Sequence, residues 1–191
     1  MRIALDAMGG DYAPAATVAG AAQALADFAG IDLVLVGHQE RLAPLLKEHG
    51  LTRHPRLEVV HAEEVVGMDE HSTAAIRGKK QASITVAAEL VKAGRADALV
   101  SAGHTGAAVA ATTVKLRLLP GVERPAIATI MPAVGGHFIL VDAGATIDCK
   151  PIHLAQFAVM GEVFARHALG IPRPRIGLLS VGGEDVKGNE L

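Results

Sequence analysis

The sequence predicts an α/β fold, with a mostly parallel β-sheet covered by helices on both faces. The main observation is that short runs rich in β-branched residues or leucine alternate with alanine-rich segments of helical character. A helix between two strands returns the second strand parallel to the first, through a right-handed crossover. Half of the 191 residues are apolar and 20% are charged, which is enough material for a buried core. We therefore expect one α/β domain over residues 1–191.

The predicted strands are short runs in which β-branched residues or leucine dominate. Glycine or a polar residue follows most of these runs and marks where the chain turns. The predicted strands are Ile3–Asp6, Leu33–Val36, Leu57–His61, Ala98–Ser101, Ile127–Met131, Phe138–Asp142 and Ile176–Ser180. We expect them to join one sheet whose strands run mostly in the same direction.

The predicted helices lie between these strands and are rich in alanine and leucine. They are Ala15–Phe28, Arg41–Glu48, Ile84–Lys92, Gly106–Leu116 and Pro151–Leu169. Ser83 is the expected N-cap of the third helix, and Pro151 opens the last one. In that last helix, apolar and small residues recur at steps of three and four and predict one buried face: Leu154, Phe157, Ala158, Gly161, Ala165 and Ala168. The stretch 63–81 has a mixed pattern interrupted by glycines and receives no assignment.

Composition excludes several classes of function. Lys and Arg number 18 against 20 Asp and Glu, a formal net charge of −2, whereas a general nucleic-acid binder needs a basic surplus. The two longest charge-free runs, 98–114 and 125–141, contain glycine, proline or polar residues, and neither is expected to span a membrane. Asp6 interrupts the segment where a signal peptide has its apolar stretch, and Cys149 is the only cysteine. We therefore expect a cytoplasmic protein that binds no nucleic acid.

Four glycine-containing loops follow predicted strands and carry polar residues: 6–11, 101–106, 142–144 and 180–184. In a parallel sheet the carboxyl ends of the strands lie at one edge, where α/β proteins bind their ligands. Glycine lets backbone N–H groups approach an anion, and a following helix adds the positive end of its dipole. The loops therefore predict a site for a phosphate-bearing ligand at this edge. The alternative is that such turns need glycine for steric reasons alone.

Known phosphate and metal motifs do not explain these loops. Residues 183–188 have the glycine spacing of a P-loop, but Asn189 stands where the lysine should follow. No G-x-G-x-x-G follows a predicted strand. Neither H-x-x-x-H nor C-x-x-C spacing occurs among the nine histidines and the single cysteine. We expect neither a metal nor a cofactor.

Single residues suggest more specific roles, each with a structural alternative. Cys149 beside Lys150 could accept an acyl group as a thiolate, or could be a structural cysteine in a turn. Ser101 with His104 is similar to part of a hydrolase dyad but lacks the G-x-S-x-G elbow, so His104 is expected to donate a hydrogen bond at a helix start. Lys187 follows a glycine-rich turn and could hold an oxyanion, or could lie in a solvated loop.

Four segments, taken in order, carry a resemblance to a known family. They are Ile3–Pro14, Ser101–Ala107, Val141–Ala145 with Asp148–Pro151, and Lys187–Glu190, supported by Glu64–Asp69 and Leu154–Gly161. Together they resemble the phosphate acyltransferase (PlsX) family of bacterial phospholipid synthesis. The sequence departs from that family at His104 and Ser180, where asparagine is common. It also stops at Leu191, short of typical members, so residues 1–191 are expected to be the N-terminal portion of a longer domain.

The resemblance implies transfer of a long-chain acyl group from acyl-[acyl carrier protein] to inorganic phosphate, giving an acyl phosphate. It implies an α/β fold similar to that of phosphotransacetylases and of isocitrate and isopropylmalate dehydrogenases, and a homodimer. The partners it implies are acyl carrier protein and inorganic phosphate, with a functional link to a membrane glycerol-3-phosphate acyltransferase. Peripheral attachment to the inner face of the membrane is left open.

The implied chemistry needs no catalytic triad, because phosphate is already ionised and the thiol leaves readily as a thiolate. We expect direct attack by phosphate without an acyl-enzyme. From their loop positions, the residues of the phosphate cradle are Gly9, Gly10, Gly103, Thr105 and Gly106. The expected catalytic residues are Lys187 and, secondarily, His104, which would stabilise charge. Further candidates at the edge of the site are Asp6, Asp11, Ser101, Asp142, Gly144, Lys150 and Asn189.

The densest basic cluster consists of Arg77, Lys79 and Lys80, and it is expected to dock the acidic carrier protein. The alternative is a solvated helix face. Two other functions stay open at this point. The same fold could serve as a non-catalytic module that binds the carrier protein or the membrane surface. It could also serve as a nucleotide-dependent dehydrogenase, since the dehydrogenases of the related fold do not use the dinucleotide glycines.

Overall fold

The structure, a computed structural model, describes residues 1–70 and 72–180. The chain divides into two compact units, of which the first is Met1–Arg117 and the second begins at Leu118. Each unit is described by itself. The expectation of one domain over residues 1–191 stays a prediction.

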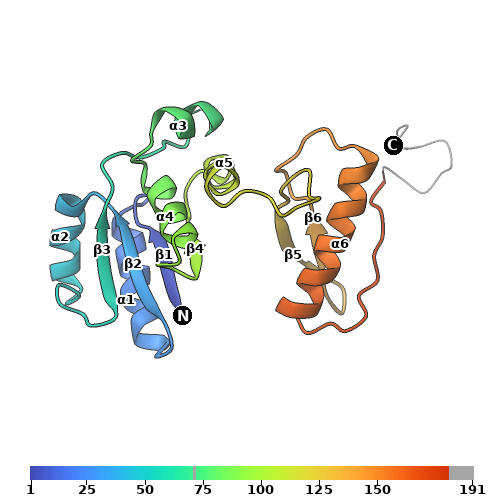
Figure 1. Cartoon of the computed structure of the whole chain (residues 1–191). Coiled ribbons are helices and arrows are strands. Elements are labelled where there is room, and N and C mark those ends of the chain that lie inside the picture. The colour runs from blue at the N-terminus through green and yellow to red at the C-terminus, as the bar shows by residue number, and fades with distance from the viewer. Residues whose placement is uncertain (71, 181–191) are drawn as a thin grey trace. The chain divides into compact units, whose positions relative to one another are not determined.

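The first unit is built on a four-stranded parallel sheet in the order β3-β2-β1-β4 (Figure 1). Its strands are β1 (Arg2–Asp6), β2 (Asp32–Gly37), β3 (Leu57–His61) and β4 (Ala98–Val100). Its helices are α1 (Ala15–Asp27), α2 (Gln39–Glu48), α3 (Ser72–Gly78), α4 (Ser83–Lys92) and α5 (Thr105–Leu116). The α/β class with a parallel sheet is confirmed, and these strands and the four predicted helices of the unit lie within a few residues of their predicted bounds.

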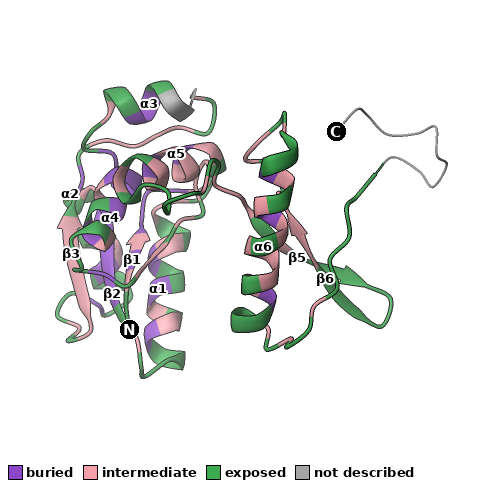
Figure 2. Ribbon diagram, turned by 45° about the vertical axis from the view of Figure 1, so that its right-hand side comes forward, coloured by how far each residue is buried: buried purple, intermediate pink, exposed green. Residues whose placement is uncertain are grey.

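The core of the first unit follows from the alternation of side chains along the strands. In β2, Leu33 and Leu35 pack with α1 and α2, whereas Val34 and Val36 pack with α4 on the other face. A strand buried on both faces is an unbroken apolar run, as the central strands of parallel sheets usually are. Figure 2 shows the buried residues of this unit gathered in the strands and on the inner sides of the helices. Packing on both faces holds the parallel strands in place, with their carboxyl ends at one edge of the sheet.

The segment without a sequence-based assignment contains the short helix α3 and an isolated parallel bridge between Glu64 and Ala82. The prediction that Ser83 caps α4 is wrong. Ala82 holds the N-cap position without a side-chain hydrogen bond, and Ser83 is the first residue of the helix. The physical reason is the bridge, because the backbone N–H of Ser83 donates to the carbonyl oxygen of Glu64. That pairing sets where α4 begins.

The second unit contains an antiparallel hairpin, β5 (Ala128–Ala133) and β6 (Gly136–Val141), and the long helix α6 (Pro151–Ala168). The expectation that these two strands join one parallel sheet with the others is wrong. Only two residues separate them, and a parallel partner needs a crossover of a dozen or more. Gly135 takes a φ of +80° in this turn, a value that favours glycine. The strands and the helix themselves are confirmed.

The predicted strand Ile176–Ser180 is also wrong. A strand exists through hydrogen bonds to a neighbouring strand, and residues 176–180 form no strand in the described chain. The side chains of Ile176, Leu178 and Leu179 are exposed there. In the described residues, no helix combines the length and the apolar character needed to cross a membrane.

Candidate functional site

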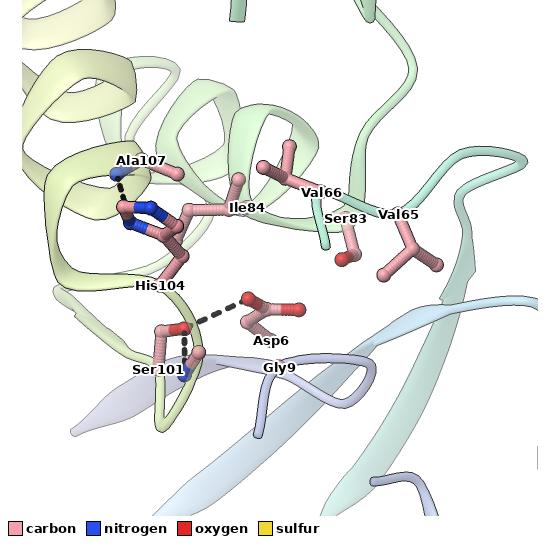
Figure 3. A pocket seen from close by; sticks show the side chains of 10 residues that line it. Asp6, Gly9, Val65, Val66, Ser83, Ile84, Ser101, His104 and Ala107 are labelled. Carbon is pink, nitrogen blue, oxygen red and sulfur yellow. Dashed lines mark hydrogen bonds between the residues drawn. The ribbon is translucent and has the colours of Figure 1, made fainter. Parts of the chain in front are cut away.

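A small hollow lies between the loops that follow β1 and β4, at the carboxyl edge of the parallel sheet (Figure 3). From β1 the sheet grows through β2 and β3 on one side, and β4 is added on the other. Open α/β sheets bind their ligands where the strand order reverses in this way. The hollow itself has a volume of about 10 Å³, room for roughly one water molecule. A larger ligand would therefore contact its mouth.

The polar floor of the hollow is a chain of hydrogen bonds that joins the two strand ends. The carboxylate of Asp6 is 3% exposed and accepts from the backbone N–H of Met8 at 3.2 Å and from the hydroxyl of Ser101 at 2.8 Å. Ser101 Oγ in turn accepts from the N–H of Gly103 at 3.1 Å. The single hydroxyl proton of Ser101 is therefore directed at Asp6. Ser101 and Asp6 fix the two loops to each other, and both line the hollow.

Gly9 and Gly103 meet backbone to backbone across the hollow. A Cβ on Gly9 would lie 2.6 Å from Asp6 Oδ2 and 2.9 Å from the backbone nitrogen of Gly103. A Cβ on Gly103 would lie 2.9 Å from the Cα of Gly9. These contacts leave no space for a side chain, so both glycines have a steric reason to be there. Their role in a phosphate cradle stays a prediction.

The neighbouring residues of the first loop differ in their position. Gly10 has a φ of +114°, which favours glycine, and a Cβ there would lie 3.2 Å from the carbonyl oxygen of Ala102. Asp11 is exposed and does not line the hollow. The glycine therefore shapes the turn, whereas the carboxylate of Asp11 faces solvent.

His104 lines the hollow and holds the N-cap position of α5. Its Nδ1 accepts a hydrogen bond from the backbone N–H of Ala107 at 3.3 Å. An accepting Nδ1 is unprotonated, so the neutral imidazole carries its proton on Nε2. Nε2 is therefore the N–H donor of the ring. This arrangement is compatible with a hydrogen-bond donor and removes Nδ1 from any role as a general base.

Thr105 and Gly106 begin α5 directly after His104. The first N–H groups of a helix have no carbonyl partner within it, and the helix dipole is positive at this end. His104 satisfies the N–H of Ala107, and within the described residues no acceptor is found for the N–H groups of Thr105 and Gly106. Two predicted cradle residues thus sit where backbone donors are available for an anion.

The opposite side of the hollow is mostly apolar, with the hydroxyl group of Ser83 as its polar exception. Val65 and Val66 reach it from the segment after β3, Ile84 from α4 and Ala107 from α5 (Figure 3). Val66 also packs against the small core that contains Ile84 and Ala107. Sequence reasoning missed these residues as part of the site. The signal that could have found them is the segment Glu64–Asp69, which already stood out in the family resemblance.

The remaining predicted site residues lie in the second unit or outside the described residues. Lys187 and Asn189 lie outside the described residues, as does most of the fourth predicted loop. Asp142 lies in the second unit, where its carboxylate accepts from the N–H groups of Ile127 and Thr146, both at 2.7 Å. Gly144 and Lys150 follow it in the same unit. The expectation that four loops share one sheet edge is wrong for this third loop, because β6 belongs to a separate hairpin.

Lys150 and Cys149 make hydrogen bonds with residues close to them in the sequence. Lys150 is exposed at the N-cap position of α6, and its backbone N–H donates to Nδ1 of His153 at 3.1 Å. Cys149 is half-buried, with Sγ 4.0 Å from the carbonyl oxygen of Thr146. Across residues 1–70 and 72–180, no group of three or more His, Cys, Asp or Glu side chains is placed to hold a metal ion.

The basic cluster near α3 is not uniform. Arg77 and Lys80 are exposed. Lys79 instead donates to Glu70 Oε1 at 2.5 Å and to the carbonyl oxygen of Val65 at 2.8 Å. The Lys79 ammonium, and then the N–H of Gly67, hold the pKa of Glu70 below its ordinary value. Lys79 is thus bound into the segment that lines the hollow.

Comparison with known proteins places the chain in a family. The sequence matches the family described as "Fatty acid synthesis protein" over residues 1–191. The chain belongs to this family. Among its curated relatives, a phosphate acyltransferase of Geobacter sulfurreducens is 53% identical over 191 residues, and one of Desulforamulus reducens is 50% identical. The chain spans 55% and 56% of the length of these two relatives. The predicted family is confirmed.

A solved structure agrees with the expected fold of this fatty acid synthesis family member. The EutD phosphotransacetylase from Staphylococcus aureus is similar with a TM-score of 0.60, over 86% of this chain and 52% of its own. The sequences are 21% identical, so the likeness concerns the fold. The expected phosphotransacetylase-like α/β fold is confirmed.

Proposed function

We propose that the protein acts in the transfer of a fatty acyl group from acyl-[acyl carrier protein] to inorganic phosphate, giving an acyl phosphate for phospholipid synthesis. The observation that carries the proposal is the meeting of the β1 and β4 loops at the start of α5. It occurs in a chain about half identical to phosphate acyltransferases. The hollow has a polar side and a mostly apolar side, and because it holds only about one water molecule, phosphate and the alkyl chain would both bind at its mouth.

In the proposed reaction, a phosphate oxygen attacks the carbonyl carbon of the thioester. The new C–O bond forms, the C–S bond breaks, and the thiolate of the carrier leaves with the bonding electrons and takes a proton from water. Phosphate needs little deprotonation near neutral pH. The work left for the protein is to bring two groups together and to stabilise the oxyanion. No acyl-enzyme on Cys149 is required.

The proposed roles follow from the hydrogen-bond donors that each group can still offer to a ligand. The N–H groups of Thr105 and Gly106 and the positive end of α5 would bind phosphate at the mouth of the hollow. Nε2–H of His104 would donate to the oxyanion. Gly9, Gly10 and Gly103 would shape the cradle. The N–H of Gly103 would not itself bind phosphate, because it already donates to Ser101. Lys187 stays a proposed second source of positive charge.

Acyl carrier protein is the proposed macromolecular partner. Arg77 and Lys80 are exposed near α3 and would meet an acidic surface, with a smaller contribution from Lys79. The family resemblance also supports a homodimer, a cytoplasmic location and peripheral attachment to the inner face of the membrane. A membrane glycerol-3-phosphate acyltransferase would then consume the acyl phosphate.

The proposal is tested by direct assay. The 191-residue chain and the longest product of its gene are each incubated with acyl-[acyl carrier protein] and phosphate, and acyl phosphate is trapped as the hydroxamate. We expect phosphate-dependent hydroxamate from the longest product. Its absence would refute the proposed function. An acyl adduct on Cys149, detected by mass spectrometry, would refute direct attack while leaving the overall reaction in place.

A further inference from the structure

The apolar wall of the hollow is a short segment tethered at one end to the start of α4. The backbone N–H of Glu64 donates to the carbonyl oxygen of Gln81 at 3.1 Å, and the carbonyl oxygen of Glu64 accepts from Ser83 at 3.0 Å. These bonds belong to the isolated parallel bridge between Glu64 and Ala82. Val65 and Val66 follow directly and line the hollow. This tether fixes where the wall begins.

A second tether follows, and it is made by two side chains, those of Lys79 and Glu70. Nζ of Lys79 donates to the carbonyl oxygen of Val65 at 2.8 Å and to Glu70 Oε1 at 2.5 Å. The same Oε1 accepts from the backbone N–H of Gly67 at 2.7 Å. We call this set of contacts, among Val65, Gly67, Glu70 and Lys79, the 65–79 latch. It grips the backbone on both sides of Val66.

The central residue of the latch is a glycine, which leaves room for the Glu70 carboxylate. A Cβ on Gly67 would lie 2.9 Å from Asp69 Oδ1 and 3.2 Å from Glu70 Oε1, so a side chain there would push the carboxylate away. The lowered pKa of Glu70, caused first by Lys79 and then by the Gly67 N–H, agrees with a carboxylate held ionised by these donors. A single oxygen of Glu70 thus accepts from both the Gly67 N–H and the Lys79 ammonium.

We propose that Lys79 and Glu70 are positioning residues, which hold Val65 and Val66 as the wall of the hollow through the backbone contacts of the 65–79 latch. The inference rests on the proposed function, since it assigns to that wall the binding of the acyl donor. Neither side chain lines the hollow itself. A partly exposed ion pair adds little to global stability, so the effect of the latch falls on the geometry of the wall.

The positioning role and a role in carrier docking predict different effects when the charges of Lys79 and Glu70 are removed. Replacing Lys79 removes a positive charge, and replacing Glu70 removes a negative one. An acidic partner would bind more weakly after the first change and more tightly after the second. The latch predicts the same effect from both changes, because either one releases the backbone at Val65 and Gly67. Lys80 is an exposed neighbour of the same charge and supplies the matched control.

The experiment compares Lys79→Met, Glu70→Ala, Lys79→Arg and Lys80→Met in the longest product of the gene. Two quantities are measured: kcat and KM for acyl-[acyl carrier protein], and the NMR shifts of the Val65 and Val66 methyl groups and the Gly67 amide. We expect Lys79→Met and Glu70→Ala to raise KM about five-fold with little change in kcat, the scale of one lost hydrogen-bonded pair. Both should move the NMR signals. Lys79→Arg should retain most of the wild-type behaviour, and Lys80→Met should leave the NMR signals unchanged.

Two outcomes would overturn the inference. The first is unchanged methyl and amide signals in Lys79→Met and Glu70→Ala. The second is a KM that rises in Lys79→Met and Lys80→Met alike and falls in Glu70→Ala, which would assign the cluster to docking. If the wild-type protein transfers no acyl group, the proposed function fails. The NMR signals then decide the latch alone, and movement in both variants but not in Lys80→Met supports it.

Discussion

Ser101 donates its hydroxyl proton to the buried carboxylate of Asp6, with the two oxygens 2.8 Å apart and the residues 95 positions apart in the chain. This bond joins the end of β1 to the first residue after β4. Removing a partner from a buried carboxylate costs more than the bond itself gains, because the oxygen that loses its donor stays buried and unsatisfied. The bond is therefore a stability determinant as well as part of the site.

Ser101→Ala is expected to lower the free energy of unfolding by roughly 1–3 kcal/mol, the penalty for an unsatisfied buried acceptor. Urea unfolding followed by circular dichroism measures it. Thr113→Ala is the control, because the Thr113 hydroxyl only donates to the carbonyl oxygen of Val109 within α5. A change below about 0.5 kcal/mol is expected there. Equal effects at the two positions would contradict the prediction.

Gly9→Ala and Gly103→Ala are each expected to destabilise the protein by about 1–3 kcal/mol, the usual cost of overpacking. Each new Cβ would fall within 2.9 Å of backbone or side-chain atoms in the facing loop. Thermal unfolding provides the measurement. Gly20→Ala in α1 is the matched control, since its Cβ would meet nothing within 4 Å. That substitution should stabilise by about 0.5–1 kcal/mol, because alanine favours helix.

Three substitutions of His104 separate its two proposed roles. His104→Ala should lose about 1 kcal/mol of stability, because the cap of α5 is removed. His104→Asp keeps a capping oxygen but has no N–H donor, so it should be stable and should transfer acyl groups slowly. His104→Asn keeps both an acceptor and a donor, and it should retain stability and activity. Wild-type activity in His104→Asp would remove Nε2–H from the mechanism.

Arg56 ties the end of α1 to the strands. Its guanidinium donates to the carbonyl oxygens of Leu25 at 2.5 Å, Phe28 at 2.7 Å and Ile31 at 3.0 Å. Arg56→Lys keeps the charge but loses the planar fork that reaches several acceptors at once. We expect it to cost about 1–2 kcal/mol of stability, measured by urea unfolding. Arg53→Lys, an exposed neighbour, should change stability by less than about 0.5 kcal/mol.

Glu70 gives a pH dependence of known sign. Its pKa is lowered in the folded protein from an ordinary value of 4.5, chiefly by Lys79. A group with a lower pKa in the folded state stabilises the fold above its unfolded pKa and loses that contribution as pH falls through the folded pKa. The stability difference between wild type and Glu70→Gln, measured by urea unfolding at a series of pH values, should therefore be small but present near neutral pH. It should vanish as the pH falls well below about 4. A difference that grows on acidification would show that Glu70 is not held ionised.

The parallel sheet of the first unit could be predicted because its signals are local and consistent. Leu33 to Val36 form a run apolar on both faces, which is typical of a central parallel strand, and a helical segment precedes and follows it. The meeting of the loops that contain Asp6 and Ser101 then follows from topology. The pairing of two parallel strands places their carboxyl ends at one edge, whatever their separation in sequence.

The missed features depend on contacts that no local pattern carries. The wall made by Val65 and Val66 is set by the bridge to Ala82 and by Lys79, and a lone polar side chain gives no sign of its distant carbonyl partner. The sequence predicts β5 and β6 as members of the parallel sheet, because strand patterns do not reveal direction. The short connection through Gly135 does reveal it, since only antiparallel strands can be joined by so few residues.

The contact of Gly9 with Gly103 has a mechanical consequence. Since no side chain separates the two main chains, neither turn can shift without displacing the other. A displacement of the loop after the first strand would therefore also displace the loop in which the fifth helix starts. The anion donors and the carboxylate beneath them thus behave as a single rigid piece.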